Sequence, residues 1–360
     1  MKLKIGIVSA EPSGDLLGAE LIESLSEKFD TVEVVGVGSG PLKKYSVEKD
    51  RRELEIMGLI DPILNYSKIK AYQSRLIKKF ISNDIDLFIG IDSPDFNIGI
   101  HKALKMKGIP TAHVVCPSVW AWRSGRISQF KHIDYMLYLF DFEKKYAAKV
   151  NKASFCVGHP LVRQSESFQD NKTENLICLL PGSRTSEIKS NVGIMIDSFR
   201  SFNNNKKYQA VIPCYSNENK KLVEKYIKDE KNIKATMESS MESLSKSVAA
   251  VVCSGTATLE AMLLEVPSVI VYRTNFLNFF LLRIFVKTKF IGLPNIISGK
   301  EIFKEFIQTD FSSKNIQKEL NNLIANRTKI LKSLKESKNK ISLPNFKSFT
   351  EKFYDDCRSR

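Results

Sequence analysis

Two carboxylates follow a strongly apolar run in the stretch LFIGIDSPDFNIG (87–99). Asp92 comes directly after the run, and Asp95 follows Pro94. A carboxylate at the end of a buried strand is partly desolvated, which raises its pKa and suits it to take a proton from a substrate hydroxyl. Asp95 is better placed to cap the helix that the next residues predict. The stretch predicts a general base at Asp92, with a purely structural carboxylate as the alternative.

Small-residue loops precede three other predicted helices. Free backbone amides at a helix N-terminus favour an anion, and glycine lets the backbone approach a ligand closely. An ordinary helix cap is the alternative in each case. The residues selected on this basis are Glu11, Ser13, Gly14 and Asp15 in the first loop, Gly182, Ser183 and Arg184 in the second, and Ser254, Gly255, Thr256 and Glu260 in the third.

Each loop suggests its own contact. The Arg184 guanidinium can neutralise a diphosphate, and Glu260 can accept a hydrogen bond from a ribose hydroxyl. Glu11 and Asp15 can bind sugar hydroxyls or simply cap their helix. No loop matches GxxxxGKS or GxGxxG, which argues against a kinase or a dinucleotide-dependent oxidoreductase. The DxD spacing in NDID (83–86) lies at the amino end of a predicted strand, so we expect no metal there.

Both tryptophans lie in one short segment, PSVWAWR (117–123). Trp120 and Trp122 either anchor the end of a strand or form a wall for a sugar or acyl chain, with Arg123 reaching a phosphate. The residues alone leave these two interpretations open.

The composition is that of a globular protein. The chain has 360 residues, of which 43% are hydrophobic and 26% charged, and no run approaches the roughly 18–20 apolar residues of a membrane span. The N-terminus does not continue as a signal peptide, and six scattered cysteines without a CxxC pair fit a reducing cytoplasm. The net charge of +15 suits nucleic acid, an anionic membrane or phosphorylated substrates, but no nucleic-acid-binding motif is present.

Short apolar runs that alternate with helical patterns predict parallel sheets buried on both faces. A polar stretch, 163–175, separates two series of such runs and indicates a linker. We therefore expect an α/β protein with two doubly wound Rossmann-like domains facing a cleft, over 1–165 and 166–330. A C-terminal helical tail, 331–360, is expected to pack back on the first domain, either of its own chain or of a partner chain. The expected strands are Lys4–Ser9, Val32–Val37, Leu87–Ile91, Thr111–Val115, Tyr135–Leu139 and Ala153–Val157, then Leu176–Leu180, Ala210–Pro213, Val248–Val252 and Ser268–Tyr272.

The loops together resemble the lipid-A-disaccharide synthase family. The similar motifs are EPSGDLLGA (11–19), GIDSPDFN (90–97), PSVWAWR (117–123), GHPL (158–161), LLPGSR with SEI (179–188), SGTATLE (254–260) and LPN with GKE (293–301). They occur in the family's order over most of the chain. Departures beside presumed functional residues, which bear on kinetics rather than on the reaction, are Ser9, Pro12, Cys116, Cys253 and Gly292.

The resemblance implies a GT-B fold and an inverting glycosyl transfer from UDP-2,3-diacylglucosamine to the 6-hydroxyl of 2,3-diacylglucosamine 1-phosphate (lipid X), without cofactor or metal. It implies that Asp92 is the base, and that Arg184 and the 254–256 helix start stabilise the leaving diphosphate, with Asn295 completing the donor side. The loop at 11–15 and the tryptophan segment are expected on the acceptor side. His159 is expected to be structural, and His101, on an apparently exposed helix, to have no catalytic part.

A lipid substrate requires a surface that meets a membrane. The segment 56–80 mixes Ile60, Ile63, Leu64 and Ile69 with basic residues, as interfacial segments do, although a core helix with solvated lysines has the same composition. We expect a cytoplasmic protein at the inner face of the cytoplasmic membrane, no nucleic-acid partner, and leave open a homodimer. The alternatives are a GT-B UDP-sugar 2-epimerase and a non-catalytic nucleotide- or nucleic-acid-binding protein.

Overall fold

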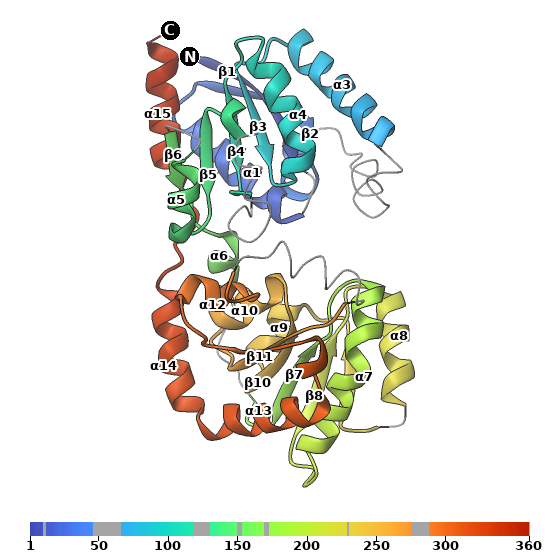
Figure 1. Ribbon diagram of the computed structural model, residues 1–360. Coiled ribbons are helices and arrows are strands. Elements are labelled where there is room, and N and C mark those ends of the chain that lie inside the picture. Colours follow the sequence, from blue (N-terminus) through green and yellow to red (C-terminus); the bar gives the residue numbers. More distant parts are fainter. Residues whose placement is uncertain are drawn as a thin grey trace. The chain divides into compact units, whose positions relative to one another are not determined.

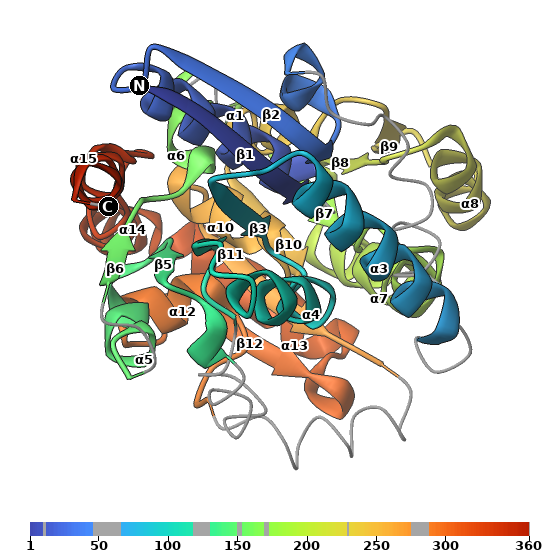
Figure 2. The same cartoon turned by 90° about the horizontal axis from the view of Figure 1, so that it is seen from above.

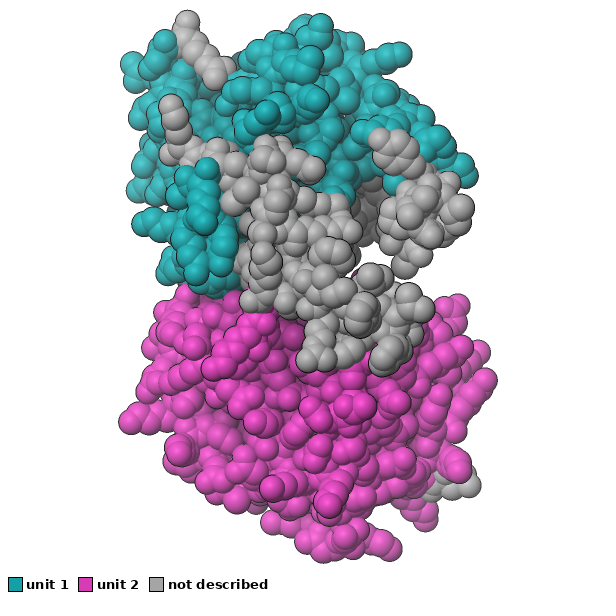
Figure 3. Space-filling model, in the orientation of Figure 1, with its two compact units in different colours: residues 1–160, 342–360 teal, residues 161–341 magenta. Residues whose placement is uncertain are grey.

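The computed structural model describes residues 1–9, 12–45, 66–117, 130–149, 153–168, 173–228, 230–274 and 288–359 (Figure 1). The chain forms two compact units, residues 1–160 with 342–360 and residues 161–341 (Figure 3). Each unit is a parallel six-stranded sheet with helices, which confirms the predicted α/β fold with two doubly wound units.

The unit boundaries differ in detail from the expected domain limits of 165, 330 and 360. The first crossing between units falls at 160/161, at the start of α6 (Pro160–Glu166). The second falls at 341/342, so α13 (Ser313–Ala325) and α14 (Arg327–Lys338) belong to the second unit. Only the last helix, α15 (Lys347–Arg358), returns to the first unit.

Unit 1 has the strand order β2-β1-β3-β4-β5-β6. Helices α3 and α4 pack together on one face of this sheet, and α1 with α15 on the other (Figure 2). The helices and strands are β1 (Lys2–Ser9), α1 (Pro12–Ser26), β2 (Thr31–Val37), η1 (Gly40–Lys44), α3 (Tyr66–Ser82), β3 (Leu87–Ile91), α4 (Pro94–Lys105), β4 (Thr111–Val114), β5 (Tyr135–Tyr138), η3 (Asp141–Glu143), α5 (Lys144–Ala147) and β6 (Ala153–Cys156).

Unit 2 has the strand order β12-β11-β10-β7-β8-β9. Helix α7 packs against α8 and α13, whereas α10 packs against α9, α12 and α14. The further elements are β7 (Leu176–Leu180), α7 (Thr185–Phe202), β8 (Gln209–Pro213), α8 (Asn217–Ile227), β9 (Ile233–Thr236), α9 (Ser240–Ser245), β10 (Ala249–Cys253), α10 (Thr256–Leu263), β11 (Ser268–Tyr272), α12 (Leu293–Ser298), β12 (Lys304–Ile307) and η4 (Gln308–Asp310).

The two strands missing from our expectation, β9 and β12, are the edge strands of the second sheet. Their sequences, IKAT and KEFI, carry charged residues and lack the apolar run that marks a strand buried on both faces. The central strands β3 and β10 are buried at every position, and the sequence predicted both.

Aromatic side chains attach α15 to unit 1. Phe349 and Phe353 are fully buried, and both rings pack edge-on against Tyr135 of β5. The Tyr135 hydroxyl donates to Asp356 at 2.7 Å, and the Ser24 and Thr350 hydroxyls are 2.9 Å apart. These contacts explain why the end of the chain belongs to the first unit.

Candidate active site

Each sheet has one point at which the direction of strand addition reverses. In unit 1, β1 pairs with β2 on one side and β3 on the other, and Ser9 and Ile91 are register partners at the carboxyl ends. In unit 2, β7 pairs with β8 and β10 in the same way. Ligands of doubly wound sheets bind at these reversal points, where adjacent loops leave in opposite directions. Most of the predicted site residues in the described part of the chain follow strands at these two points.

Asp92 follows β3 directly, at the reversal point of unit 1. Its backbone amide donates to the Val114 carbonyl at 2.9 Å, which fixes the residue to the end of β4. The side chain is half-buried, and burial raises the pKa of the carboxyl group. A hydrogen bond from the Ser93 amide to Oδ1, 2.8 Å long, acts in the opposite direction. A partly desolvated carboxylate at this edge has the properties of a general base.

The turn that carries Asp92 is held in an unfavourable conformation. Asp92 and Ser93 both have positive φ, 50° and 41°, a region that costs non-glycine residues free energy. Asn97 supports the turn, because its Nδ2 donates to the Asp92 carbonyl at 2.8 Å. Ser93 occupies the N-cap position, whereas Asp95, where we expected the cap, is the second residue of α4 and lies in its first turn. Asp95 is exposed there, where its charge favours the helix N-terminus.

The first turn of α1 packs closely against the carboxyl ends of β1 and β3. A Cβ atom on Gly14 would lie 2.8 Å from the Ser9 Oγ and 3.0 Å from the Ile91 Cγ2. Asp15 is 1% exposed, and its Oδ1 accepts from the Ser39 amide at 3.1 Å. Asp15 therefore ties α1 to the loop after β2, a contact that is not a cap of its own helix, and direct sugar binding by Asp15 stays a prediction.

In unit 2, the loop after β7 is organised around a carboxylate that we had not selected. Glu187 Oε2 accepts from the Ser183 and Arg184 amides at 3.1 and 3.3 Å, and Oε1 lies 3.2 Å from Arg184 Nη1. A Cβ atom on Gly182, whose φ is +114°, would lie 2.5 Å from Glu187 Oε2. The Arg184 side chain is nevertheless 75% exposed, so its guanidinium is accessible to a ligand.

Asn191 joins the two loops at the reversal point of unit 2. It is fully buried in α7, and its Nδ2 donates to the Pro181 carbonyl at 2.8 Å and lies 3.4 Å from the Cys253 Sγ. The loop after β10 follows Cys253 directly. Within it Ser254 is half-buried, with its Oγ 3.3 Å from the Ile291 carbonyl, while Gly255 and Thr256 are exposed at the start of α10.

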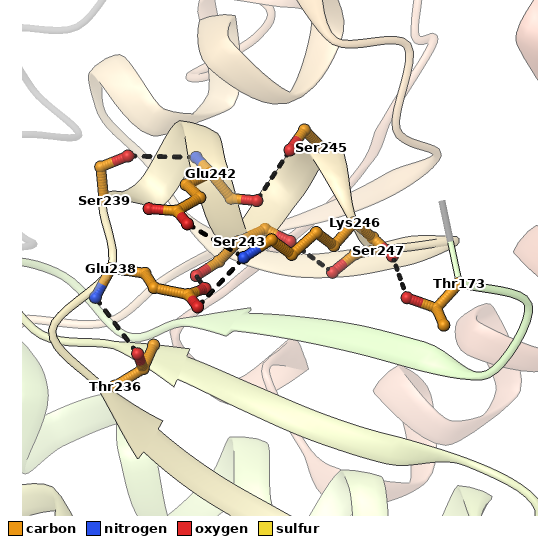
Figure 4. A network of polar contacts seen from close by, with 9 residues as sticks. All are labelled: Thr173, Thr236, Glu238, Ser239, Glu242, Ser243, Ser245, Lys246 and Ser247. Atoms are coloured by element: carbon orange, nitrogen blue, oxygen red, sulfur yellow. Dashed lines mark hydrogen bonds and ion pairs between the residues drawn. The ribbon is translucent and has the colours of Figure 1, made fainter. Parts of the chain in front are cut away.

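Glu260 lies one turn into α10 with a buried acceptor. Its Oε2 has no hydrogen-bond partner among the described residues. Burial raises the pKa of the carboxyl group, and a hydrogen bond with Ser240 lowers it by a smaller amount. Ser240 begins α9, which a polar network fixes in place (Figure 4). In that network Lys246 Nζ lies 3.0 Å from an oxygen of Glu238 and of Glu242. A buried acceptor without a partner suits a ligand hydroxyl.

Asn295 is fully buried, and its amide is saturated inside unit 2. The Oδ1 accepts from the Ile302 and Phe303 amides at 2.8 and 2.9 Å, and the Nδ2 donates to the Phe303 carbonyl and to Glu305, both at 2.7 Å. Glu305 in turn accepts from the Ile291 and Gly292 amides at 2.9 and 3.0 Å. In this arrangement Asn295 shapes the turn beside Ser254 and presents no polar atom to a ligand.

The apolar face of α3 packs into the interior. Tyr72, Leu76 and Phe80 are buried in the unit 1 core, and Ile69 packs against the same cluster. Ile69 is therefore a core contact, which is the alternative we gave for this segment. The remaining selected residues, Glu11, Trp120, Trp122, Arg123, Ile60, Ile63 and Leu64, lie outside the described residues, as does the side chain of Ser13.

One histidine prediction is wrong. His101 was expected on an exposed helix, but it is 0% exposed, and its Nε2 lies 3.0 Å from the Nδ1 of the equally buried His113. The face of α4 that holds Asn97 and His101 packs on Gly90, where a Cβ atom would lie 2.8 Å from His101 Nε2. His159 is 9% exposed and stacks on Phe140, with ring centroids 5.4 Å apart; burial lowers its pKa to about 4.

Three supporting residues escaped our selection. Asn97 and Asn191 each lie one to two turns into a helix, where the sequence reads as an ordinary polar position. Glu187 had a usable signal, because it stands at the third position of its helix, as in a capping box. In the described parts of the chain no group of three metal-ligating side chains occurs, and no helix is long and apolar enough to cross a membrane.

Comparison with solved structures defines the class. A UDP-GlcNAc 2-epimerase from Neisseria meningitidis bound to UDP-GlcNAc matches with a TM-score of 0.63, at 13% identity and over 100% of both chains. A spinosyn rhamnosyltransferase complexed with thymidine diphosphate matches with a TM-score of 0.61, at 10% identity, over 96% of this chain and 98% of that one. The fold is thus the GT-B-like fold of nucleotide-sugar epimerases and glycosyltransferases.

Sequence comparison is more specific. The family model described as lipid-A-disaccharide synthetase matches residues 5–353. The lipid-A-disaccharide synthase of Acinetobacter baylyi is 34% identical over 356 residues, which cover 91% of this chain and 89% of the relative. The chain belongs to the lipid-A-disaccharide synthase family, and it is a glycosyltransferase of lipid A biosynthesis.

Proposed function

We propose that the protein transfers 2,3-diacylglucosamine from UDP-2,3-diacylglucosamine to the 6-hydroxyl of lipid X, with inversion at the anomeric carbon. The products are the β(1→6)-linked lipid A disaccharide 1-phosphate and UDP. Inversion in one displacement requires a base for the acceptor hydroxyl and no covalent enzyme intermediate. The observation that carries the proposal is Asp92, a half-buried carboxylate with a raised pKa at the reversal point of unit 1.

In the proposed mechanism, Asp92 removes the proton of the 6-hydroxyl as its oxygen attacks the anomeric carbon. The bond from that carbon to the diphosphate breaks, and the electron pair leaves with UDP. A carboxylate with a raised pKa is a stronger base than an ordinary one. Asn97 fixes the turn from which Asp92 acts.

The donor is proposed to bind at the reversal point of unit 2. The accessible Arg184 guanidinium and the exposed start of α10 are suited to bind the negatively charged diphosphate. The buried Glu260 oxygen without a partner among the described residues suits a ribose hydroxyl. Charge-assisted contacts of this kind stabilise a leaving diphosphate as its charge develops. Asn295 contributes indirectly, through Glu305 and the turn at Gly292.

We further propose that the protein works in the cytoplasm at the inner face of the membrane, since both substrates carry acyl chains. The outward side of α3 supports this, because Lys68, Lys70 and Lys78 are exposed. The apolar contact is assigned to Ile60, Ile63 and Leu64, without Ile69. Flotation with anionic liposomes tests the assignment: Ile63→Ser with Leu64→Ser should reduce binding, and equal flotation of the folded variant would remove it.

The reaction is tested by incubating the purified protein with UDP-2,3-diacylglucosamine, with and without lipid X, and analysing the products by mass spectrometry. A disaccharide 1-phosphate and UDP are expected only when lipid X is present. An epimerase would alter the UDP-sugar without lipid X, and that outcome would refute the transfer. The Asp92→Asn enzyme serves as the control for catalysis by this site.

A further inference from the structure

The loop after β7 already holds an anion, and that anion is part of the protein. Glu187 accepts two consecutive backbone amides, those of Ser183 and Arg184, and pairs with the Arg184 guanidinium at 3.2 Å. Two amides and a guanidinium around one carboxylate are the donors by which proteins bind a phosphate group.

The loop is built to bring this carboxylate close. Gly182 has a φ of +114°, and a side chain there would collide with Glu187, since its Cβ would lie 2.5 Å from Oε2 and 2.6 Å from the Glu187 Cβ. Asn219 Nδ2 donates to the Ser183 carbonyl at 2.9 Å. This contact fixes the peptide group that joins Ser183 to Arg184 and therefore orients the Arg184 amide. The donor groups are therefore already oriented, and only the group that they hold can change.

We propose that Glu187 is an internal competitor of the donor diphosphate. It keeps the Arg184 guanidinium and the two amides in position in the empty protein, and it is displaced from the guanidinium when a nucleoside diphosphate binds. This rests on the proposed donor site. It adds to that site an acidic residue that weakens phosphate binding, so that UDP is released more readily after each transfer.

Electrostatics sets the expected size of the effect. Glu187 and a diphosphate carry charge of the same sign and compete for the same guanidinium, and the loop is at the surface, with the Glu187 side chain 28% exposed. Removing one unit of like charge at contact distance in a solvated site changes affinity by about three- to tenfold. A glutamine keeps the shape and can still accept the two amide hydrogen bonds, so Glu187→Gln removes mainly the charge.

The control is Glu218→Gln. Glu218 is an exposed glutamate in the first turn of α8, next to Asn219, so the substitution makes the same charge change near the same loop without touching the 182–184 donors. The probes are UDP and uridine, which differ only in the diphosphate. Affinities are measured by isothermal titration calorimetry on the full chain, and melting temperatures report folding.

Glu187→Gln should bind UDP about three- to tenfold more tightly than the native protein, while its affinity for uridine stays within twofold. Glu218→Gln should match the native protein for both probes. Unchanged or weaker UDP binding by a folded Glu187→Gln protein, or an equal gain for uridine, would overturn the proposal. If Glu187→Gln does not fold, Glu187→Ala is judged by the same criteria. A folded native protein that binds no UDP would instead refute the donor site itself.

Discussion

The Asn97 side chain donates from Nδ2 to the backbone carbonyl of Asp92 at 2.8 Å, so a buried amide holds the residue proposed as the base. Asn97 is 0% exposed, and it reaches a turn whose two residues, Asp92 and Ser93, both have positive φ. Such a turn persists only when its surroundings determine it. The contact makes Asn97 a positioning residue for the reaction.

We expect Asn97→Ala to lower kcat at least tenfold, because the turn that carries Asp92 loses its support. UDP affinity should change little, because Asn97 lies in unit 1 and the proposed donor site lies in unit 2. The part-buried Asp92 carbonyl would lose this partner, at a cost of about 1 kcal/mol of stability. Steady-state kinetics, UDP titration and thermal melting measure the three quantities.

Asn97→Asp gives a further readout of positioning. An aspartate donates to the Asp92 carbonyl only when protonated, so the activity of this variant relative to the native enzyme should fall as pH rises. A pH profile parallel to that of the native enzyme would show that the donated hydrogen bond does not position the base.

Asp92→Asn should lower turnover by about a hundred- to ten-thousandfold, since it preserves shape and removes basicity. Asp95→Asn keeps a good residue for a helix start, so activity and melting temperature should be nearly unchanged. An inactive but folded Asp95→Asn enzyme would mean that the base is the other carboxylate of the pair. Protonation of Asp92 removes the base, so native activity should decline as the pH falls. Because burial raises the pKa of Asp92, this decline should begin at a higher pH than it would for an exposed aspartate.

Arg184→Gln should weaken UDP binding by about 1.5–3 kcal/mol, the range of a hydrogen bond to a charged group. Arg200→Gln is the matched control, because Arg200 lies in the last turn of α7, the helix that Arg184 precedes, and pairs with Asp197 and Glu230 instead. Titration with UDP compares the two. Equal affinities in both variants would remove Arg184 from the donor site.

The His101–His113 pair should make unit 1 sensitive to acid. Burial lowers the pKa of both rings, that of His113 to about 3, while unfolded histidines titrate near 6.5. The unfolded state therefore binds more protons below about pH 6.5, so stability is complete above that pH and is lost progressively as pH falls toward 3. The melting temperature of His101→Gln should fall less steeply between pH 6.5 and 4.5 than that of the native protein. Parallel curves would show that the pair does not carry the acid sensitivity.

The sequence alone was sufficient for the two parallel sheets, because strands buried on both faces leave unmistakable apolar runs, as in LFIGI and AAVVC. It also determined which loops follow those strands, and hence Asp92 and Arg184 as candidates. It did not reveal the edge strands β9 and β12, whose charged residues obscure the pattern.

Tertiary structure decided what each polar side chain does, because a hydrogen-bond partner far along the chain leaves no mark in the local sequence. Asn295 and Asp15 turn inward to saturated or buried contacts, although both lie in the first turn of a helix that follows a loop suited to ligands. His101 is buried because its helix face packs on Gly90, where only a glycine leaves room for the ring. Glu187 differs, because its partners are only three and four residues away and its capping-box position was a usable local signal. Only the structure shows that two amides and a guanidinium meet around this one carboxylate.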